Sequence, residues 1–296
     1  MSNQNASAIL KLIVEEGPQA RAGSIPELRL AVSRFYEGFA TPMRLALQDI
    51  HLDGLPGRWI GATEAEPHRT VLFFHGGGYS TGSASDHQDL CARLSAASGA
   101  RVLSIDYRLA PENPFPAAVE DCLAACIWLL ERGVPPKRLA LAGISSGASL
   151  VVATLLGLRD LGRALPAGAV CMSPVADLAF PGESMRANQG LDWLAPQRLE
   201  AIRANYLAGA DPANPLASPI KADLRGLPPL LIQAGGHEIM RDDIRALADK
   251  AGAAGVDLTY EEAPEMFHGW QLFASRLAEG EAAIARAGDY IKKLIP

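Results

Sequence analysis

The chain has 296 residues, of which 49% are hydrophobic, and its formal net charge is −6. A chain of this length forms two ordinary domains or one large α/β domain, and its core is large enough to need no disulfide bonds. Four scattered cysteines argue against a disulfide framework, and we expect them to be ordinary buried thiols. The dispersed acidic charge predicts no nucleic-acid partner, because such partners normally require a basic surface.

The first 45 residues are predicted to be helical and amphipathic, with apolar side chains at Ile9, Leu10, Ile13 and Val14. The opening stretch, MSNQNASAIL, lacks the basic segment that begins a signal peptide. We therefore expect no signal peptide, no stable membrane anchor and a cytoplasmic location.

Two short apolar segments follow in residues 43–62. The pairs Asp53-Gly54 and Pro56-Gly57 in this region are turn signals. Short apolar segments joined by such turns are typical of a β-hairpin, which is the structure predicted here.

From residue 70 onward, hydrophobic runs alternate with helix-like stretches, which predicts an α/β fold with a mostly parallel sheet flanked by helices. Several runs are hydrophobic throughout, as expected for strands buried on both faces. The uncharged stretch 139–158 is interpreted as a strand leading into a buried helix rather than a membrane span, because glycines and serines interrupt it. The predicted strands are residues 70–74, 101–105, 139–144, 168–172, 230–234 and 257–260.

Residues 177–226 break this alternation and are rich in Pro, Asn, Asp and Met, with a helix predicted near residues 196–207. We interpret the segment as an insertion over the carboxyl ends of the strands. Open α/β sheets bind their ligands at that edge.

A candidate nucleophile, Ser145, lies in the sequence Gly-Ile-Ser-Ser-Gly of residues 143–147. The pattern G-x-S-x-G alone is weak, but here it joins a predicted strand to a predicted helix, as a nucleophile elbow requires. Gly143 and Gly147 would leave room for a strained turn, and the helix start would place free N–H groups beside the serine. The alternative is a serine-rich turn that performs no chemistry.

Three successive glycines, Gly76 to Gly78, follow the strand at residues 70–74. Their bare N–H groups could bind an oxyanion together with the N–H of Ser146, the residue after the nucleophile. A flexible loop or a phosphate-binding loop is the alternative, but no Lys-Ser or Lys-Thr pair follows the glycines. His75 is expected to brace this loop by hydrogen bonds.

The general base is predicted to be His268, because it follows the last strand-like run by one loop and comes after Ser145 in the chain. The other histidine after Ser145 is His237. It is the weaker candidate, because its orienting acid would have to come from the inserted segment.

The orienting acid is expected in the loop after residues 230–234. Glu238 is the preferred candidate, since it lies nearest the end of that strand, and Asp242 is the second choice. Asp243 is also present, but acids in the first turn of a helix have an ordinary electrostatic role. These acids and His237 lack the spacing of a metal-binding helix, so no metal is expected.

Taken together, these residues resemble the bacterial hormone-sensitive-lipase family of α/β-hydrolase carboxylesterases over most of the chain beyond the N-terminal helices. The matching segments are residues 75–78, 106–112, 114–118, 143–147, 173–174, 217–219, 227–230 and 268–269. The resemblance implies an α/β-hydrolase fold whose catalytic domain spans residues 46–296. It also implies a helical cap built from residues 1–45 and the insertion at about 177–226.

The resemblance further implies that Ser145 is the nucleophile and His268 the base, with the N–H groups of Gly77, Gly78 and Ser146 forming the oxyanion hole. Glu238 stands where most relatives carry Asp, a replacement known in the family. Ile144 also departs from the family, where Asp or Thr usually precedes the serine. Candidate substrate-binding residues are Tyr79, Ile144, Trp193 and Tyr206, although packing within the cap explains the last two equally well.

The expected function is therefore that of a serine carboxylesterase that hydrolyses short- to medium-chain esters, its small-molecule partners, without a cofactor. An amidase or a specialised metabolite esterase is the first alternative, because the triad residues do not separate these activities. The second alternative is a non-catalytic small-molecule receptor on the same fold. His268 argues against it, since such receptors lose the triad histidine. The resemblance also allows a homodimer formed through an edge strand.

Overall fold

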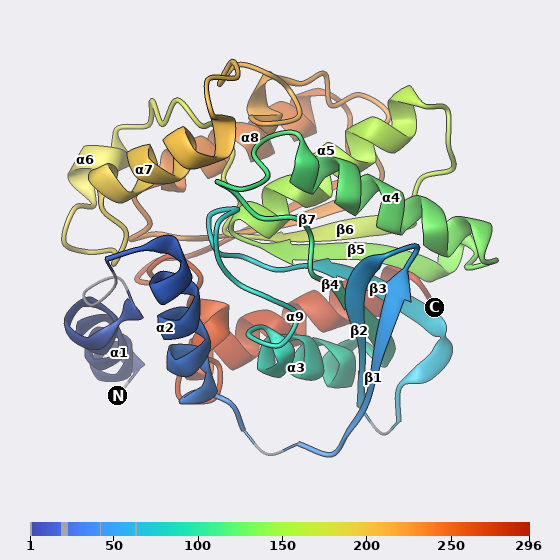
Figure 1. The fold of residues 1–296 in the computed structure, drawn as a ribbon, viewed down its shortest axis with the longest axis horizontal. Helices are drawn as coiled ribbons and strands as arrows, with labels where there is room; N and C mark the ends of the chain where they lie inside the picture. Colours follow the sequence, from blue (N-terminus) through green and yellow to red (C-terminus); the bar gives the residue numbers. More distant parts are fainter. Residues whose placement is uncertain (1, 19–22, 42, 63) are drawn as a thin grey trace.

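The computed structural model describes residues 2–18, 23–41, 43–62 and 64–296. Eight strands in this part of the chain form one sheet in the order β1-β2-β4-β3-β5-β6-β7-β8 (Figure 1). The pairs β1·β2 and β2·β4 are antiparallel, and every other neighbouring pair is parallel. The strands are β1 (Leu45–Leu52), β2 (Leu55–Ala62), β3 (Glu66–Phe74), β4 (Ala100–Ile105), β5 (Leu139–Ile144), β6 (Gly168–Met172), β7 (Leu230–Gly235) and β8 (Leu258–Ala263).

Helices cover both faces of the sheet (Figure 1). One face carries α3 (Gln88–Ser98) and α9 (Ala278–Leu294), and the other carries α4 (Ala117–Glu131), α5 (Ser146–Asp160) and α8 (Arg241–Ala253). The central strand β5 is buried at every position, which explains its continuous hydrophobic run. The predicted α/β layering and all six predicted strands are confirmed. Short 3-10 helices lie at Pro136–Arg138 (η2), Pro219–Lys221 (η3) and Trp270–Phe273 (η4).

The predicted hairpin of residues 43–62 is confirmed as the antiparallel pair β1 and β2. Asp53 and Gly54 form its tight turn with φ of 51° and 101°. Positive φ at both central residues is the conformation that matches the twist of a two-residue hairpin, and glycine adopts it at little cost. The stretch 139–158 likewise consists of β5 and the start of α5, both buried.

Four further helices belong to the N-terminus and to the insertion between β6 and β7, which we call the cap segment (residues 177–226). They are α1 (Ser2–Glu16), α2 (Ile25–Glu37), α6 (Ser184–Ala187) and α7 (Pro196–Leu207). The last matches the helix predicted at residues 196–207. None of the helices in the described ranges is long and apolar enough to cross a bilayer.

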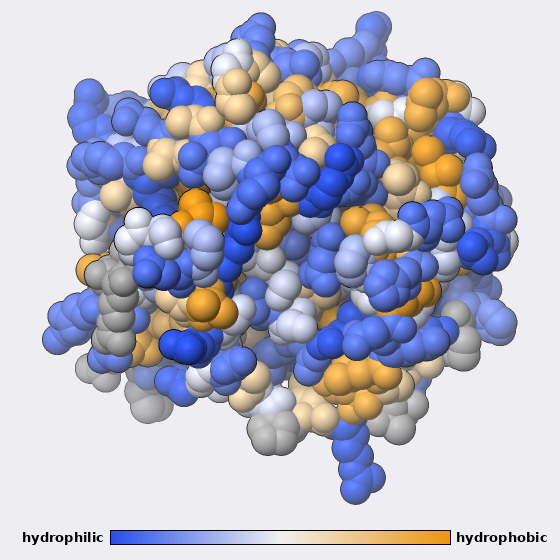
Figure 2. All heavy atoms as spheres, viewed as in Figure 1, coloured by the Kyte–Doolittle hydropathy of each residue, from blue (hydrophilic) through white to orange (hydrophobic). Residues whose placement is uncertain are grey.

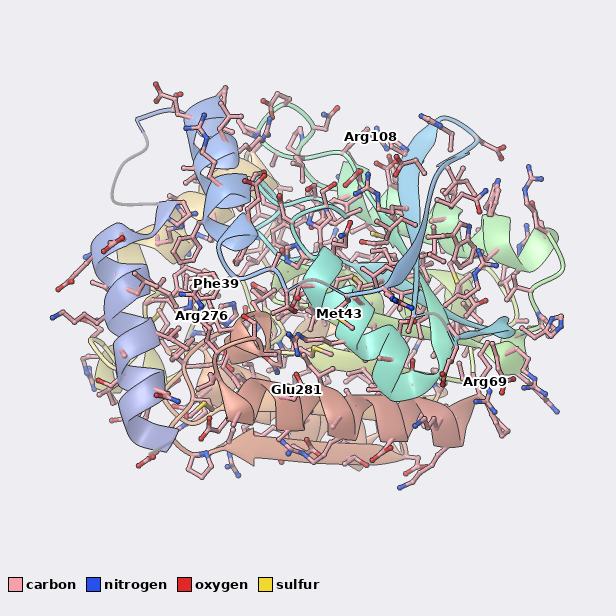
Figure 3. All side chains as sticks on the ribbon, turned by 90° about the horizontal axis from the view of Figure 1, so that it is seen from below. Phe39, Met43, Arg69, Arg108, Arg276 and Glu281 are labelled. Carbon is pink, nitrogen blue, oxygen red and sulfur yellow. The ribbon has the colours of Figure 1, made fainter. Side chains whose placement is uncertain are left out.

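The end of α2 is fixed to the C-terminal part of the chain. Arg276 donates a hydrogen bond to the carbonyl oxygen of Gly38 at 2.7 Å. Its guanidinium carbon also lies 4.6 Å from the centre of the Phe39 ring (Figure 3). These contacts hold the N-terminal helices beside η4.

Hydrophobic side chains lie mainly inside the protein. The face shown in Figure 2 is largely hydrophilic, and its hydrophobic residues form separate patches. All four cysteines are buried and free, as expected for core thiols.

Candidate active site

Ser145 lies at the sharp turn between β5 and α5, where the strand–turn–helix pattern predicts it. Its backbone has φ of 56° and ψ of −126°, an unfavourable conformation for a residue with a side chain. Gly147 is needed for this turn, because a Cβ atom there would fall 2.0 Å from the carbonyl oxygen of Phe74. The turn presents the Ser145 hydroxyl group at the carboxyl end of the sheet and at the start of a helix.

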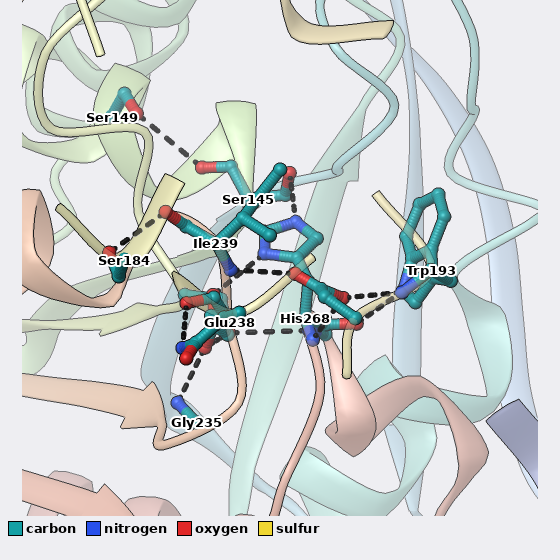
Figure 4. A network of polar contacts seen from close by, with 12 residues as sticks. Ser145, Ser149, Ser184, Trp193, Gly235, Glu238, Ile239 and His268 are labelled. Carbon is teal, nitrogen blue, oxygen red and sulfur yellow. Dashed lines mark hydrogen bonds and ion pairs between the residues drawn. The ribbon is translucent and has the colours of Figure 1, made fainter. Parts of the chain in front are cut away.

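His268 and Glu238 continue a chain of hydrogen bonds that begins at Ser145 (Figure 4). Nε2 of His268 lies 2.8 Å from Oγ of Ser145, and its Nδ1 lies 2.8 Å from Oε2 of Glu238. An ionised carboxylate only accepts hydrogen bonds, so Nδ1 carries the proton and donates to Glu238. The lone pair of Nε2 is then free to accept the hydrogen of the Ser145 hydroxyl group. The three side chains are therefore aligned for removal of the serine proton.

The environment of His268 raises its basicity. The exposed fractions of His268 and Glu238 are 2% and 0%. Burial alone lowers the pKa of His268, but the hydrogen bond and the charge of Glu238, together with the charge of Asp192, outweigh it. The net effect raises the pKa above the ordinary value of 6.5.

Glu238 is held by a second set of contacts. Its Oε1 accepts hydrogen bonds from Oγ of Ser173 at 2.8 Å and from the N–H of Gly235 at 2.5 Å. Oγ of Ser173 in turn accepts the N–H of Gly269 at 3.3 Å, next to the base. Ser173 therefore links the loop that carries the acid to the loop that carries the histidine.

The other candidate acids have different surroundings. Oδ2 of Asp242 accepts the N–H of Ser184 at 2.8 Å, and Oδ1 pairs with Arg241 at 2.7 Å. Asp243 is buried in the first turn of α8. No group of three His, Cys, Asp or Glu side chains in the described ranges could hold a metal ion. The geometry thus brings Glu238, and not Asp242, to the histidine.

The glycine loop after β3 lies beside Ser145. Gly76, Gly77 and Gly78 line the same cavity as Ser145. Among the described residues, the N–H groups of Gly77, Gly78 and Ser146 have no acceptor. Ser146 is the first residue of α5, where the unpaired N–H groups of the helix carry a positive partial charge. These three donors can bind an oxygen atom of a ligand.

Two histidines hold the glycine loop in place. Nδ1 of His75 lies 2.8 Å from the carbonyl oxygen of Gly76, which is the bracing contact expected of it. Nε2 of His87 accepts the N–H of Gly76 at 3.1 Å. Burial lowers the pKa of His87 to about 3, so its ring is neutral and able to accept. The part played by His87 was not predicted, because nothing in the sequence pairs it with the glycines.

The cap segment binds the loops that carry the acid and the base. Oδ1 of Asp192 accepts the N–H of His268 at 3.0 Å, and Oδ2 accepts the N–H of Ile239 at 3.0 Å. Nε1 of the adjacent Trp193 donates to the carbonyl oxygen of His268 at 2.7 Å (Figure 4). Burial raises the pKa of Asp192 to about 6, so its carboxylate is still ionised at neutral pH. Asp192 is a second residue that the sequence analysis missed.

Asp192→Ala should lower the free energy of unfolding by about 3 kcal/mol, because it leaves buried N–H donors of His268 and Ile239 without an acceptor. Urea unfolding followed by fluorescence measures this loss. Asp211→Ala is the matched control, since Asp211 is exposed and accepts one bond within its own turn. The control should change stability by less than about 0.5 kcal/mol. Equal losses of stability in the two variants would contradict the role of Asp192 in holding the loops of His268 and Ile239 together.

An apolar cavity opens in front of Ser145 and His268. The N-terminal helices, the cap segment and the loops after β3 and β8 together enclose it. Its apolar lining residues are Ile13, Val32, Phe35, Val175, Phe180, Leu194, Leu199, Ile202, Met240, Leu272 and Phe273. Such a cavity suits a small ligand with a hydrocarbon part.

Of the four candidate substrate-binding residues, Trp193 lines this cavity and the other three do not. Tyr79 and Tyr206 are buried and stack on each other, with ring centroids 3.6 Å apart. Ile144 is buried in the core on the side of the sheet that faces α3 and α9. The expectation for these three is therefore corrected: their side chains are used in packing.

Comparison with known proteins gives a consistent result. Residues 71–272 match the family described as alpha/beta hydrolase fold. The chain is 44% identical to an acetyl-hydrolase of Streptomyces hygroscopicus over 286 residues, which is 96% of this chain and 95% of that protein. It is 32% identical to an esterase of Acinetobacter venetianus over 269 residues, which is 90% of this chain and 88% of that protein.

Solved structures are similar over the whole fold. An esterase from the bacterial hormone-sensitive lipase (HSL) family superposes with a TM-score of 0.95 at 42% identity and covers 99% of each chain. A hormone-sensitive lipase from a metagenome library gives a TM-score of 0.95 at 35% identity, over 100% of this chain and 99% of its own.

Proposed function

We propose that this chain, a carboxylic ester hydrolase of the bacterial hormone-sensitive-lipase esterases, hydrolyses short- to medium-chain acyl esters through an acyl-enzyme intermediate. Like these esterases, the chain belongs to the alpha/beta hydrolase fold family, whose pattern it matches. The observation that carries this proposal is the hydrogen-bond chain from Ser145 through His268 to Glu238 at the wall of an apolar cavity.

In the proposed acylation step, Oγ of Ser145 attacks the ester carbonyl carbon while Nε2 of His268 takes its proton. The carbonyl oxygen becomes an oxyanion, which the N–H groups of Gly77, Gly78 and Ser146 stabilise. One donor of this kind typically contributes about 3–4 kcal/mol to the transition state. His268 then gives its proton to the leaving alcohol as the carbon–oxygen bond breaks, and an acyl ester remains on Ser145.

Deacylation repeats the same proton transfers with water. His268 takes a proton from water as the water oxygen attacks the acyl carbon. The oxyanion forms again at the same N–H donors, and the proton on His268 returns to Oγ of Ser145 as the carboxylic acid leaves. Glu238 keeps the imidazole in the required tautomer and stabilises its charged form in both steps.

The chain-length preference is supported by the shape of the cavity lining. Bulky side chains from the N-terminal helices and the cap segment, among them Phe35, Phe180 and Leu199, surround the space in front of Ser145. Their apolar surfaces favour a hydrocarbon acyl chain, and their bulk restricts its length.

Two measurements test the proposed function directly. A 4-nitrophenyl phosphonate should add one phosphonyl group per chain, located at Ser145 by peptide mass spectrometry. Turnover of 4-nitrophenyl esters from acetate to laurate should be highest at the short or middle lengths. A protein that neither reacts with the phosphonate nor turns over any of these esters would contradict the proposal. A matched amide that reacts as fast as its ester would favour an amidase.

The activity should depend on pH through His268, which acts as a base only when it is neutral. Because the pKa of His268 is raised above 6.5, kcat/KM for 4-nitrophenyl butyrate should fall as the pH drops, with its midpoint above pH 6.5. Below that midpoint the loss should reach about tenfold per pH unit. Initial rates from about pH 5 to about pH 9 give the curve. A midpoint at or below 6.5 would show that Glu238 and Asp192 do not stabilise the imidazolium as the contacts predict.

A further inference from the structure

One charged side chain stands out in the apolar cavity. Arg198 of α7 is the only Lys or Arg among the described residues that line it, and no Asp or Glu side chain lines it. The arginine is half-buried, and its Nε is buried without a hydrogen-bond partner in the described part of the chain. This differs from surface arginines such as Arg108, which pairs with Asp121 at 2.8 Å.

Arg198 lies on the side of α7 that contacts the glycine loop. Ile202 lies four residues further on α7, so the two side chains share one face of the helix. The side chain of Ile202 contacts the glycine loop, because a Cβ atom on Gly78 would fall 2.8 Å from it. The helix face that carries Arg198 therefore lies over the glycine loop, which lines the cavity together with Ser145.

Among the described residues, no Asp or Glu pairs with Arg198. The pKa of Arg198 is lowered by burial, but a guanidinium remains protonated at any ordinary pH. Tyr36 of α2 also lines the cavity and interacts electrostatically with Arg198. Burial and the charge of Asp86 raise the pKa of Tyr36, so its phenol is uncharged. Asp86 itself lines a separate hollow, not this cavity.

Nε of Arg198 is buried without an acceptor among the described residues, which costs desolvation free energy, and an anion bound beside the guanidinium would offset that cost. A planar guanidinium is well suited to hold a carboxylate through paired hydrogen bonds. An apolar cavity that served only hydrocarbon chains would gain nothing from such a group.

We propose that Arg198 is a substrate-recognition residue and that the preferred esters of this enzyme carry a carboxylate remote from the scissile carbonyl group. This inference rests on the proposed esterase function. The carboxylate belongs either to the acyl part, as in a monoester of a dicarboxylic acid, or to the alcohol part.

Matched pairs of esters test the inference. The acyl pair is mono-4-nitrophenyl glutarate and its neutral amide, 4-nitrophenyl 4-carbamoylbutanoate. The alcohol pair is 4-carboxyphenyl butyrate and 4-carbamoylphenyl butyrate. In one of the two pairs, kcat/KM for the anionic ester should exceed that for the neutral ester by about 10- to 100-fold. The pair that shows the preference tells which part of the substrate reaches Arg198.

Variants then assign the preference to one residue. Arg198→Gln should bring the anionic-to-neutral ratio close to one, and Arg198→Lys should keep part of it, since lysine retains the charge but not the fork of donors. Arg186→Gln is the control for net charge, because Arg186 lies in the same cap segment with its side chain 83% exposed. The control should leave the ratio unchanged. Each ratio is taken within one variant, so a general loss of activity does not affect it.

The outcomes separate this inference from the function on which it rests. Hydrolysis of the neutral esters with no anionic preference in either pair would overturn the inference and leave the esterase assignment standing. A preference that persists in Arg198→Gln would also overturn it. If the wild-type enzyme hydrolysed none of the four esters, the proposed function would fail, and the inference with it.

Discussion

Replacing Ser145 with alanine should reduce kcat/KM for 4-nitrophenyl butyrate by about 10,000-fold or more, because in the proposed mechanism Ser145 is the nucleophile that forms the acyl-enzyme. The rate that remains would come from the oxyanion-binding N–H groups and from substrate binding alone. Stopped-flow or long-time absorbance measurements at 405 nm follow release of 4-nitrophenol. The variant should also fail to take up a phosphonate label.

The control for Ser145→Ala is the same substitution at a serine away from the site. Ser275 is half-buried, and its hydroxyl group has no partner in the described part of the chain, so Ser275→Ala removes no hydrogen bond. It should keep wild-type activity within about twofold. Thermal unfolding of both variants shows whether each is folded. A folded Ser145→Ala protein that kept a tenth of the wild-type rate would contradict the assignment of Ser145 as the nucleophile.

The fold and the positions of Ser145 and His268 were predictable because their signals are local in the sequence or follow from chain order. The run that forms β5, the turn around Ser145 and the helix α5 are consecutive, so one short segment contains the whole elbow. The position of His268 followed from chain order, because the loops that follow the strands of a parallel sheet all lie at one edge of the sheet.

Asp192 and His87 were not predicted because both act by accepting backbone N–H groups of other segments. Asp192 accepts N–H groups from the loops of Glu238 and His268, more than 40 positions away in the chain. Backbone N–H groups of those loops look alike in any sequence, so no pattern pairs them with Asp192. His87 likewise accepts a backbone N–H group, that of Gly76, and no sequence pattern pairs the two.

The incorrect expectations for Tyr79 and Tyr206 have a different cause. Both residues occur in segments that border the cavity, and aromatic side chains in such segments suit a ligand pocket. Their rings instead stack on each other at 3.6 Å and bury their surface inside the protein. A sequence shows which side chains are near a site, but the direction of each side chain depends on packing that only the full fold determines.

Replacing Glu238 with glutamine should lower kcat/KM for 4-nitrophenyl butyrate by about 1,000- to 10,000-fold. The amide group has nearly the same size as the carboxylate, but its NH2 can donate to Nδ1 of His268. The imidazole would then carry its proton on Nε2 and could not accept the proton of Ser145. Loss of the negative charge would also destabilise the imidazolium. The pH profile is a second readout, since the acidic limb should move to lower pH as the pKa of His268 falls.

Two variants make the Glu238 test specific. Asp242→Asn should keep activity within about threefold, because Asp242 bonds to Ser184 and Arg241 and not to the histidine. Glu238→Asp keeps the charge on a shorter side chain and should retain at least about ten times the activity of Glu238→Gln. Unfolding in urea should show that Glu238→Gln remains folded, since an amide oxygen can still accept from Ser173. If Asp242→Asn lost more activity than Glu238→Gln, the acid would be Asp242, and the 2.8 Å contact between Glu238 and His268 would be only structural.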